Sequence, residues 1–224
     1  MTSGSERTAR DGIRTVAPLA IAVFAFGITY GVLARGTGMG AFAPVVMSLT
    51  TFAGSAQFAA VTVLGSGGSA ATAILAAALL NARYAPIGVS VAPFMHGSVW
   101  SRFLHAQLIV DESWAVAAEG EGRWNPRVLL GAGLGIYVAW VVGTAIGVIF
   151  GDLIGDPNRL GLDAAFPALF LALLAPQIRN RVSIAAALLG AAIAIALTPF
   201  TPAGVPIVAA SAACLIGLVT KDGA

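Results

Sequence analysis

The chain has 224 residues, of which 58% are hydrophobic and only 10% are charged. Soluble domains are about 25% charged and about 45–50% apolar, so this composition excludes an ordinary soluble fold. The formal net charge is +2, and no basic run is dense enough to indicate binding to nucleic acid. The mean hydropathy of +0.90 indicates a protein whose solvent is largely lipid.

The N-terminal segment, residues 1–15, is polar and carries Arg7, Arg10 and Arg14. It leads into an apolar run without a convincing signal-peptide cleavage site. Basic residues favour the cytoplasmic side of a membrane, so we expect this segment to be cytoplasmic. A single transmembrane domain is expected over residues 16–219, followed by a cytoplasmic tail over 220–224.

Long uncharged stretches follow the N-terminal segment. A helix needs about 20 residues to cross about 30 Å of hydrocarbon. Cutting the chain at its polar residues, glycines and prolines predicts seven apolar spans. They are Val16–Ala34, Phe42–Leu64, Ser69–Ala92, Val128–Gly151, Leu162–Pro176, Val182–Thr198 and Ala203–Val219.

An eighth segment, Ser98–Ala118, is more polar than these seven. Counting it as a crossing places the basic loop with Arg179 and Arg181 in the cytoplasm, as the positive-inside rule favours. A re-entrant hairpin, for which Ser66–Ala70 is a candidate, would give the same parity. The sequence therefore predicts an all-α, polytopic bundle of about eight transmembrane helices, or seven if residues 98–118 do not span, with both termini in the cytoplasm.

The polar residues of the eighth segment form two stripes when they are placed on a helix of 100° per residue. Neither stripe is suited to face lipid. One interpretation is an interfacial or bundle-lining helix whose charges pair with neighbouring helices. The other is that Asp111 or Glu112 lines a transport path.

Arg83 is the only charged residue between Gly36 and Ser101. An arginine at membrane depth costs about 2.5–3.5 kcal/mol unless it is paired or lies near an interface. Pro86 follows closely, and a proline removes a backbone donor, so we expect a broken helix near residues 81–86. Freed backbone groups beside a fixed positive charge suit the carboxylate of a small zwitterion. Alternatively, Arg83 reaches the interface or pairs with a carboxylate of the eighth segment.

The second span contains the sequence Phe-Ala-Gly-Ser-Ala-Gln-Phe, residues 52–58. Ser55 and Gln57 are polar groups at membrane depth, and Gly54 allows a close approach to the backbone. Such groups need partners inside the bundle. Interhelical hydrogen bonds would explain them, and so would a substrate site.

Small residues recur at a spacing of four in two of the spans. Gly27 and Gly31 lie in the first, and Gly143, Gly147 and Gly151 lie in the fourth. This spacing lets helix backbones approach closely. It also forms a weak internal echo between the two halves of the chain, which in a transporter would indicate an internal repeat.

No catalytic constellation and no metal-binding pattern is present in the sequence. The two histidines, His96 and His105, lie far from the single cysteine, Cys214, which excludes an intrachain disulfide. There is also no P-loop for ATP. We expect a protein that is not an enzyme and that needs no cofactor.

Four blocks of the sequence resemble the AzlC family of branched-chain amino acid permease subunits, in order and in spacing. The resemblance extends from about residue 10 to residue 220. The blocks are Pro18 with Gly27-x-x-x-Gly31, Ser48 with Phe52-Ala-Gly-Ser-Ala-Gln-Phe58, Asn81-Ala-Arg83-Tyr84, and Asp111-Glu112-Ser113-Trp114-Ala115.

The resemblance implies an exporter of branched-chain amino acids such as valine in the bacterial inner membrane, driven by the proton gradient. It also implies a small hydrophobic partner subunit of the AzlD type. Together with the residues themselves, it leads to a hypothesis for the site. Arg83 and the backbone near Asn81 would bind the substrate carboxylate. Ser55 and Gln57 would contact the polar end of the substrate, and Asp111 or Glu112 would take the coupling proton.

The aliphatic end of the substrate would then lie against Phe52, Phe58 and small residues such as Gly54. A rival hypothesis is a membrane scaffold or sensor that transports nothing and uses its polar residues only for assembly with a partner. Export of another small zwitterion is a further alternative.

Overall fold

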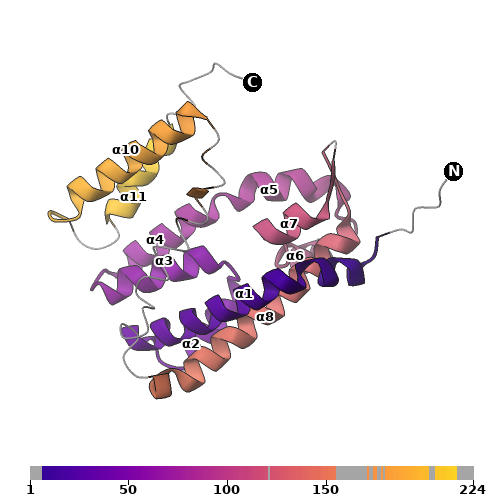
Figure 1. The fold of residues 1–224 in the computed structure, drawn as a ribbon, viewed down its shortest axis with the longest axis horizontal. Helices are drawn as coiled ribbons and strands as arrows, with labels where there is room; N and C mark the ends of the chain where they lie inside the picture. Colours follow the sequence, from indigo (N-terminus) through magenta and orange to yellow (C-terminus); the bar gives the residue numbers. More distant parts are fainter. Residues whose placement is uncertain are drawn as a thin grey trace. The chain divides into compact units, whose positions relative to one another are not determined.

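The computed structural model describes residues 7–120, 122–154, 171, 174–175, 178, 180–201 and 205–215 (Figure 1). The N-terminal half contains α1 (Ala9–Ala34), a π-helical turn (Arg35–Met39), α2 (Phe42–Thr50), α3 (Gly54–Gly65), α4 (Ala70–Asn81), α5 (Tyr84–Val91) and a 3₁₀ turn (Ala92–Phe94). It is followed by α6 (Val99–Ala106), α7 (Asp111–Ala117), β1 (Ala118–Gly120), β2 (Arg123–Trp124), α8 (Pro126–Ile154), α10 (Arg181–Leu197), α11 (Val205–Ser211) and a 3₁₀ turn (Ala212–Leu215).

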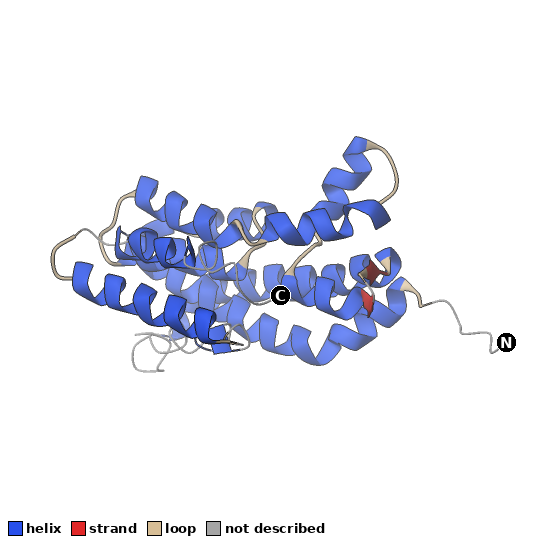
Figure 2. Ribbon diagram, turned by 90° about the horizontal axis from the view of Figure 1, so that it is seen from above, coloured by secondary structure: helices blue, strands red, loops and turns tan. Residues whose placement is uncertain are grey.

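The expected all-α architecture is confirmed in the described residues, with one small addition. Strands β1 and β2 form an antiparallel hairpin just before α8 (Figure 2). The chain divides into two compact units, Met1–Gln57 with Asn81–Gly155 and Phe58–Leu80 with Asp156–Ala224. Each unit is described by itself.

Three helical stretches of the described residues are long and apolar enough to cross a membrane. They match the first, third and fourth predicted spans and comprise Ala9–Met39, Ala70–Phe94 and Pro126–Gly151. Asn125 begins the last of them because its side-chain Oδ1 accepts hydrogen bonds from the backbone N–H groups of Arg127 and Val128. Pro126 occupies the first helical position, where a missing N–H costs nothing.

Helices α1 and α8 pack side by side and parallel along most of their length (Figure 1). Gly27 lies against the backbone of Trp140 and Gly143, and one turn later Gly31 lies against that of Gly147. Because both helices lack side chains at these points, their backbones touch. The interpretation of the glycine spacing as a close-packing device is confirmed.

The second predicted span is not one helix. Residues 42–65 are divided at 51–53 into α2 and α3. Phe52 has a positive φ of 39°, which is rare for a residue with a side chain and reverses the direction of the chain.

The eighth segment is also not a continuous helix. It is divided into α6 and α7, of 8 and 7 residues, and each is far shorter than the about 20 residues that a crossing needs. Of the two alternatives, the division into short helices favours the one in which residues 98–118 do not span as a single helix, and the count of eight crossings is not confirmed.

The broken helix expected near residues 81–86 is present. Helix α4 ends at Asn81 and α5 begins at Tyr84. Pro86 has no N–H to bond to the carbonyl of Ala82, so the ladder of hydrogen bonds cannot continue through this point.

In the second unit, α10 packs against α11. Asn180 begins α10, since its side-chain Oδ1 accepts from the backbone N–H of Ser183 at 2.8 Å. Gly190 allows α11 and the following turn to approach closely. The predicted span Leu162–Pro176 lies almost wholly outside the described residues, as does the predicted tail over 220–224.

Candidate functional site

Helices α2 and α3 are joined by a turn at residues 51–53 that lies against the middle of α8, and this helix–turn–helix segment is called the first hairpin. Phe52, at the turn, packs edge-on against the ring of Tyr137, with 4.9 Å between the ring centroids. Gly54 begins α3 directly beside the indole of Trp140, where a Cβ would lie 3.1 Å from the ring. Gly54 is therefore needed for this close approach of the hairpin to α8.

A buried hydrogen-bond network holds the hairpin on α8. The Gln57 side chain is fully buried; its Oε1 accepts from the indole N–H of Trp140 at 2.9 Å and from the backbone N–H of Ala53 at 3.3 Å. Its amide Nε2 donates to Ser48 Oγ, which in turn shares a hydrogen bond with Thr144 Oγ1, both at 2.9 Å. This is the interhelical role that the sequence left open for Gln57.

Helices α6 and α7 are joined by a short turn and are called the second hairpin; of the two, α7 packs along the beginning of α8. Helix α7 starts beside Gly133, which accommodates the carbonyl of Leu108, and ends where the Ala117 carbonyl accepts from the backbone N–H of Asn125. Ser113 Oγ accepts from the Val110 N–H at 2.9 Å and closes the first turn of α7. Helix α7 thus runs from the level of Gly133 back toward the beginning of α8.

The two hairpins approach α8 from opposite ends, and their turns meet. The side-chain amide of Gln107, between α6 and α7, donates to the Thr50 carbonyl at 2.8 Å and to the Leu49 carbonyl at 3.4 Å. The hydroxyl of Tyr137 donates to the Leu49 carbonyl at 2.9 Å. The carbonyls left free where α2 ends are therefore satisfied by side chains from the second hairpin and from α8.

Arg83 lies in the break between α4 and α5 and joins both hairpins. Its Nη2 donates to Ser55 Oγ in the first turn of α3 at 2.9 Å. The same Nη2 lies 3.0 Å from Asp111 Oδ2, at the start of α7. The guanidinium also lies 5.2 Å from the centroid of the Tyr84 ring. Three interruptions of regular helix thus converge on one arginine.

The ion pair is accessible, and not every polar atom around it is satisfied. The side chains of Arg83 and Asp111 are 35% and 36% exposed, so a small molecule can reach both. Among the described residues, Arg83 Nε and Asn81 Oδ1 are buried without a hydrogen-bond partner. Buried polar atoms usually have a hydrogen-bond partner, so these two atoms mark the break as a candidate site for a polar ligand.

Glu112 adds a second carboxyl near the ion pair. It lies in α7, which is too short to span a membrane, and burial raises the pKa of this carboxyl. The negative charge of Asp111 acts in the same direction, and the positive charge of Arg83 opposes it. Glu112 thus holds a proton more firmly than an ordinary glutamate does.

The residues predicted for the site fall into two groups. Ser55, Asn81, Arg83, Asp111 and Glu112 gather around the helix break. The others support the hairpin from behind: Phe52 and Gly54 pack on α8, and the Gln57 amide is engaged in the buried network.

Three further residues, which the sequence did not mark as part of the site, hold it together. Tyr84 stacks below Arg83, while Gln107 and Tyr137 bind the turn of the first hairpin. Tyr84 follows Arg83 directly, and Gln107 lies four residues before Asp111; these spacings were the available signals. Nothing in the sequence marks Tyr137, because its partner is a backbone carbonyl. Within the described ranges, no three acidic, histidine or cysteine residues cluster as a metal site would require.

Comparisons with known proteins give the family. The AzlC protein family model matches residues 18–154. The branched-chain amino acid transport protein AzlC of Bacillus subtilis is 30% identical over 73% of this chain and 67% of its own length. An uncharacterized membrane protein of Archaeoglobus fulgidus is 34% identical over 91% of both chains, and one of Haemophilus influenzae is 29% identical over 78% of this chain and 73% of its own.

No solved structure matches the chain. The matched residues 18–154 include the helix break, both hairpins and α8, so the site described above lies inside the matched region. Relatives from bacteria and an archaeon are membrane proteins, in agreement with the long apolar helices. This chain is a membrane protein that belongs to the AzlC family.

Proposed function

We propose that this chain is the large subunit of a secondary transporter that exports branched-chain amino acids across the cytoplasmic membrane of a bacterium. The proposal rests on the helix break at Arg83, where a partly exposed ion pair joins two half-helix hairpins. Discontinuous helices that meet around a charged residue are the usual construction of a substrate site in secondary transporters. The name of the Bacillus subtilis relative gives the substrate class.

The substrate carboxylate binds Arg83. The guanidinium has five N–H donors, and Nη2 is already occupied by Ser55 and Asp111. Its Nε has no partner among the described residues and is buried, so it would donate to a substrate carboxylate once the site opens to admit one. Charge-assisted bonds of this kind contribute about 1.5–3 kcal/mol.

The substrate ammonium group binds on the acidic side of the same cluster. Asn81 Oδ1 is an open acceptor there, and Asp111 and Glu112 supply negative charge. Burial raises the pKa of the Glu112 carboxyl, which makes it the better placed of the two carboxyls to take up a coupling proton, and an arriving ammonium group would favour release of that proton. One proton then moves against one substrate, which is the exchange that a proton-driven exporter requires.

Phe52 is turned against α8, so it supports the turn before Ser55 and does not itself contact the aliphatic side chain of the substrate. A small AzlD-like membrane subunit completes the transporter. This partner is proposed from the family resemblance.

The test is the efflux of labelled valine from cells that express this chain with and without a small AzlD-like partner, in the presence or absence of an uncoupler. Efflux should require the partner and stop with the uncoupler. Arg83→Ala should lower the efflux rate by about 10- to 150-fold, the loss of one charge-assisted bond. Arg83→Lys should restore part of it.

Arg10→Ala is the matched control, because Arg10 is exposed in the first turn of α1 and lies far from the site in sequence. Membrane insertion of each variant is checked by fractionation and by its unfolding midpoint in detergent. Normal efflux from a correctly inserted Arg83→Ala variant would disprove the role of Arg83. No efflux from the native pair in any condition would favour the scaffold hypothesis.

A further inference from the structure

A cavity that neither Arg83 nor Asp111 lines lies between α5, with its following 3₁₀ turn, and α6. Its volume is about 350 Å³, which is within the range of small-molecule sites, about 300–1,000 Å³. The walls are largely apolar and include Val91, Met95, Val99, Phe103 and Ile109. Such a groove accommodates a hydrocarbon chain.

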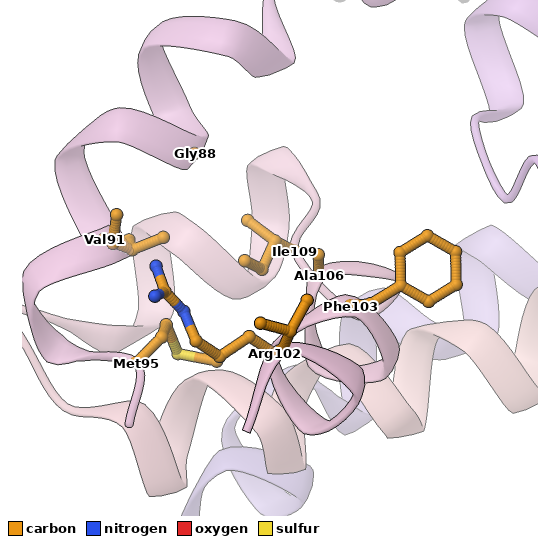
Figure 3. A pocket seen from close by; sticks show the side chains of 9 residues that line it. Gly88, Val91, Met95, Arg102, Phe103, Ala106 and Ile109 are labelled. Atoms are coloured by element: carbon orange, nitrogen blue, oxygen red, sulfur yellow. The ribbon is translucent and has the colours of Figure 1, made fainter. Parts of the chain in front are cut away.

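One cation lines this groove. Figure 3 shows the Arg102 side chain extending from α6 across the groove toward Val91 and Met95. In the part of the chain that the structure describes, Arg102 makes no ion pair and no hydrogen bond through its side chain. A guanidinium among apolar groups needs an anion, and its fork of donors fits phosphate well.

The groove lies at the basic end of its unit. Met95 belongs to one buried cluster with Val128 and Leu129, at the beginning of α8. Arg123 and Arg127 immediately precede this point in the chain. By the positive-inside rule this end faces the cytoplasm, where the leaflet is rich in anionic lipid.

Helix α6 presents an amphipathic surface beside the groove. Trp100 and Leu104, which do not line the groove, are 76% and 66% exposed. Arg102 lies on the groove side together with Val99 and Ala106. Tryptophan beside basic residues is typical of a helix at the membrane interface.

We propose that this groove binds one anionic phospholipid. The phosphate lies on the Arg102 guanidinium, and an acyl chain lies along Val91 and Met95. The lipid thereby bridges α5 and α6. It connects the helix that follows Arg83 to the hairpin that carries Asp111.

Native mass spectrometry of the delipidated chain tests this proposal. The protein, in a neutral detergent, is titrated with phosphatidylglycerol and separately with phosphatidylcholine. We expect the first phosphatidylglycerol to bind at least about fivefold more tightly, the equivalent of about 1 kcal/mol for one basic residue. Arg102→Ala should abolish this preference, and Arg102→Lys should retain part of it.

A second variant blocks the groove without touching the charge. Gly88 lines the groove, and a Cβ at this position meets nothing within 4 Å, so the side chain of Gly88→Leu starts in open space and occupies part of the groove. It should weaken the binding of both lipids, while Arg10→Ala should change neither. Unchanged phosphatidylglycerol binding in Arg102→Ala, or in Gly88→Leu, would overturn the proposal. So would an equal loss in Arg10→Ala, which would indicate general attraction to basic residues.

Discussion

The contact between α1 and α8 makes a quantitative prediction for two glycines. A Cβ at Gly27 would lie 2.8 Å from the carbonyl oxygen of Trp140 and 3.2 Å from the backbone nitrogen of Thr144. Both neighbours are backbone atoms of a helix and cannot rotate away. A Cβ at Gly151, in the same interface, would meet nothing nearer than the Cα of Val32 at 3.5 Å, an ordinary contact.

Alanine at either position gains about 1 kcal/mol of helix propensity, so that gain cancels when the two variants are compared. The remaining difference is the steric cost at Gly27, about 1–3 kcal/mol for an overpacked interface. Gly27→Ala should therefore be less stable than Gly151→Ala by this amount. The assay is equilibrium unfolding in mixed detergent and SDS micelles, followed by tryptophan fluorescence. Equal unfolding free energies would refute the close parallel packing of the two helices.

Two further predictions concern the hairpins. Gln57→Leu leaves the buried N–H donors of Trp140 and Ala53 without an acceptor, which should cost about 1–3 kcal/mol of stability for each donor. Gln107→Leu removes only exposed hydrogen bonds and should cost less than about 1 kcal/mol. Equal unfolding midpoints of the two variants would contradict this prediction. Since the pKa of Glu112 is raised above its ordinary 4.5, wild-type stability should fall as the pH rises from 4.5 through the raised pKa. Glu112→Gln should lack this fall in stability. If the unfolding free energies of the wild type and the variant changed in parallel with pH, the prediction would be contradicted.

Much of the fold follows from local chemistry. The exclusion of charge from long stretches identifies the apolar helices, because a charged side chain in lipid is costly at any position. Pro86 marks the break in the third span, since the missing N–H acts on the nearest turn. The glycine spacing likewise indicates a close helix contact. Each of these patterns can be recognised within a few consecutive residues of the chain.

The two hairpins could not be predicted from the sequence. Residues 42–65 and 98–118 each have the length of one crossing, and hydropathy does not distinguish one long helix from two short ones that turn back. At Phe52 the reversal has a positive φ without a glycine, so no turn signal is present. The hairpin is held instead by partners far along the chain, such as Trp140 and Tyr137.

The sequence alone determined which residues are out of place in lipid: Arg83, Asp111, Glu112, Ser55 and Gln57. It could not decide which of them meet, because each pairing depends on how hairpins separated by dozens of residues are folded against α8. Only the tertiary structure joined Arg83 to Ser55 and Asp111 and assigned Gln57 to a buried network. The physical reason is that the cost of burying a polar group is local, whereas the partner that compensates for it is not.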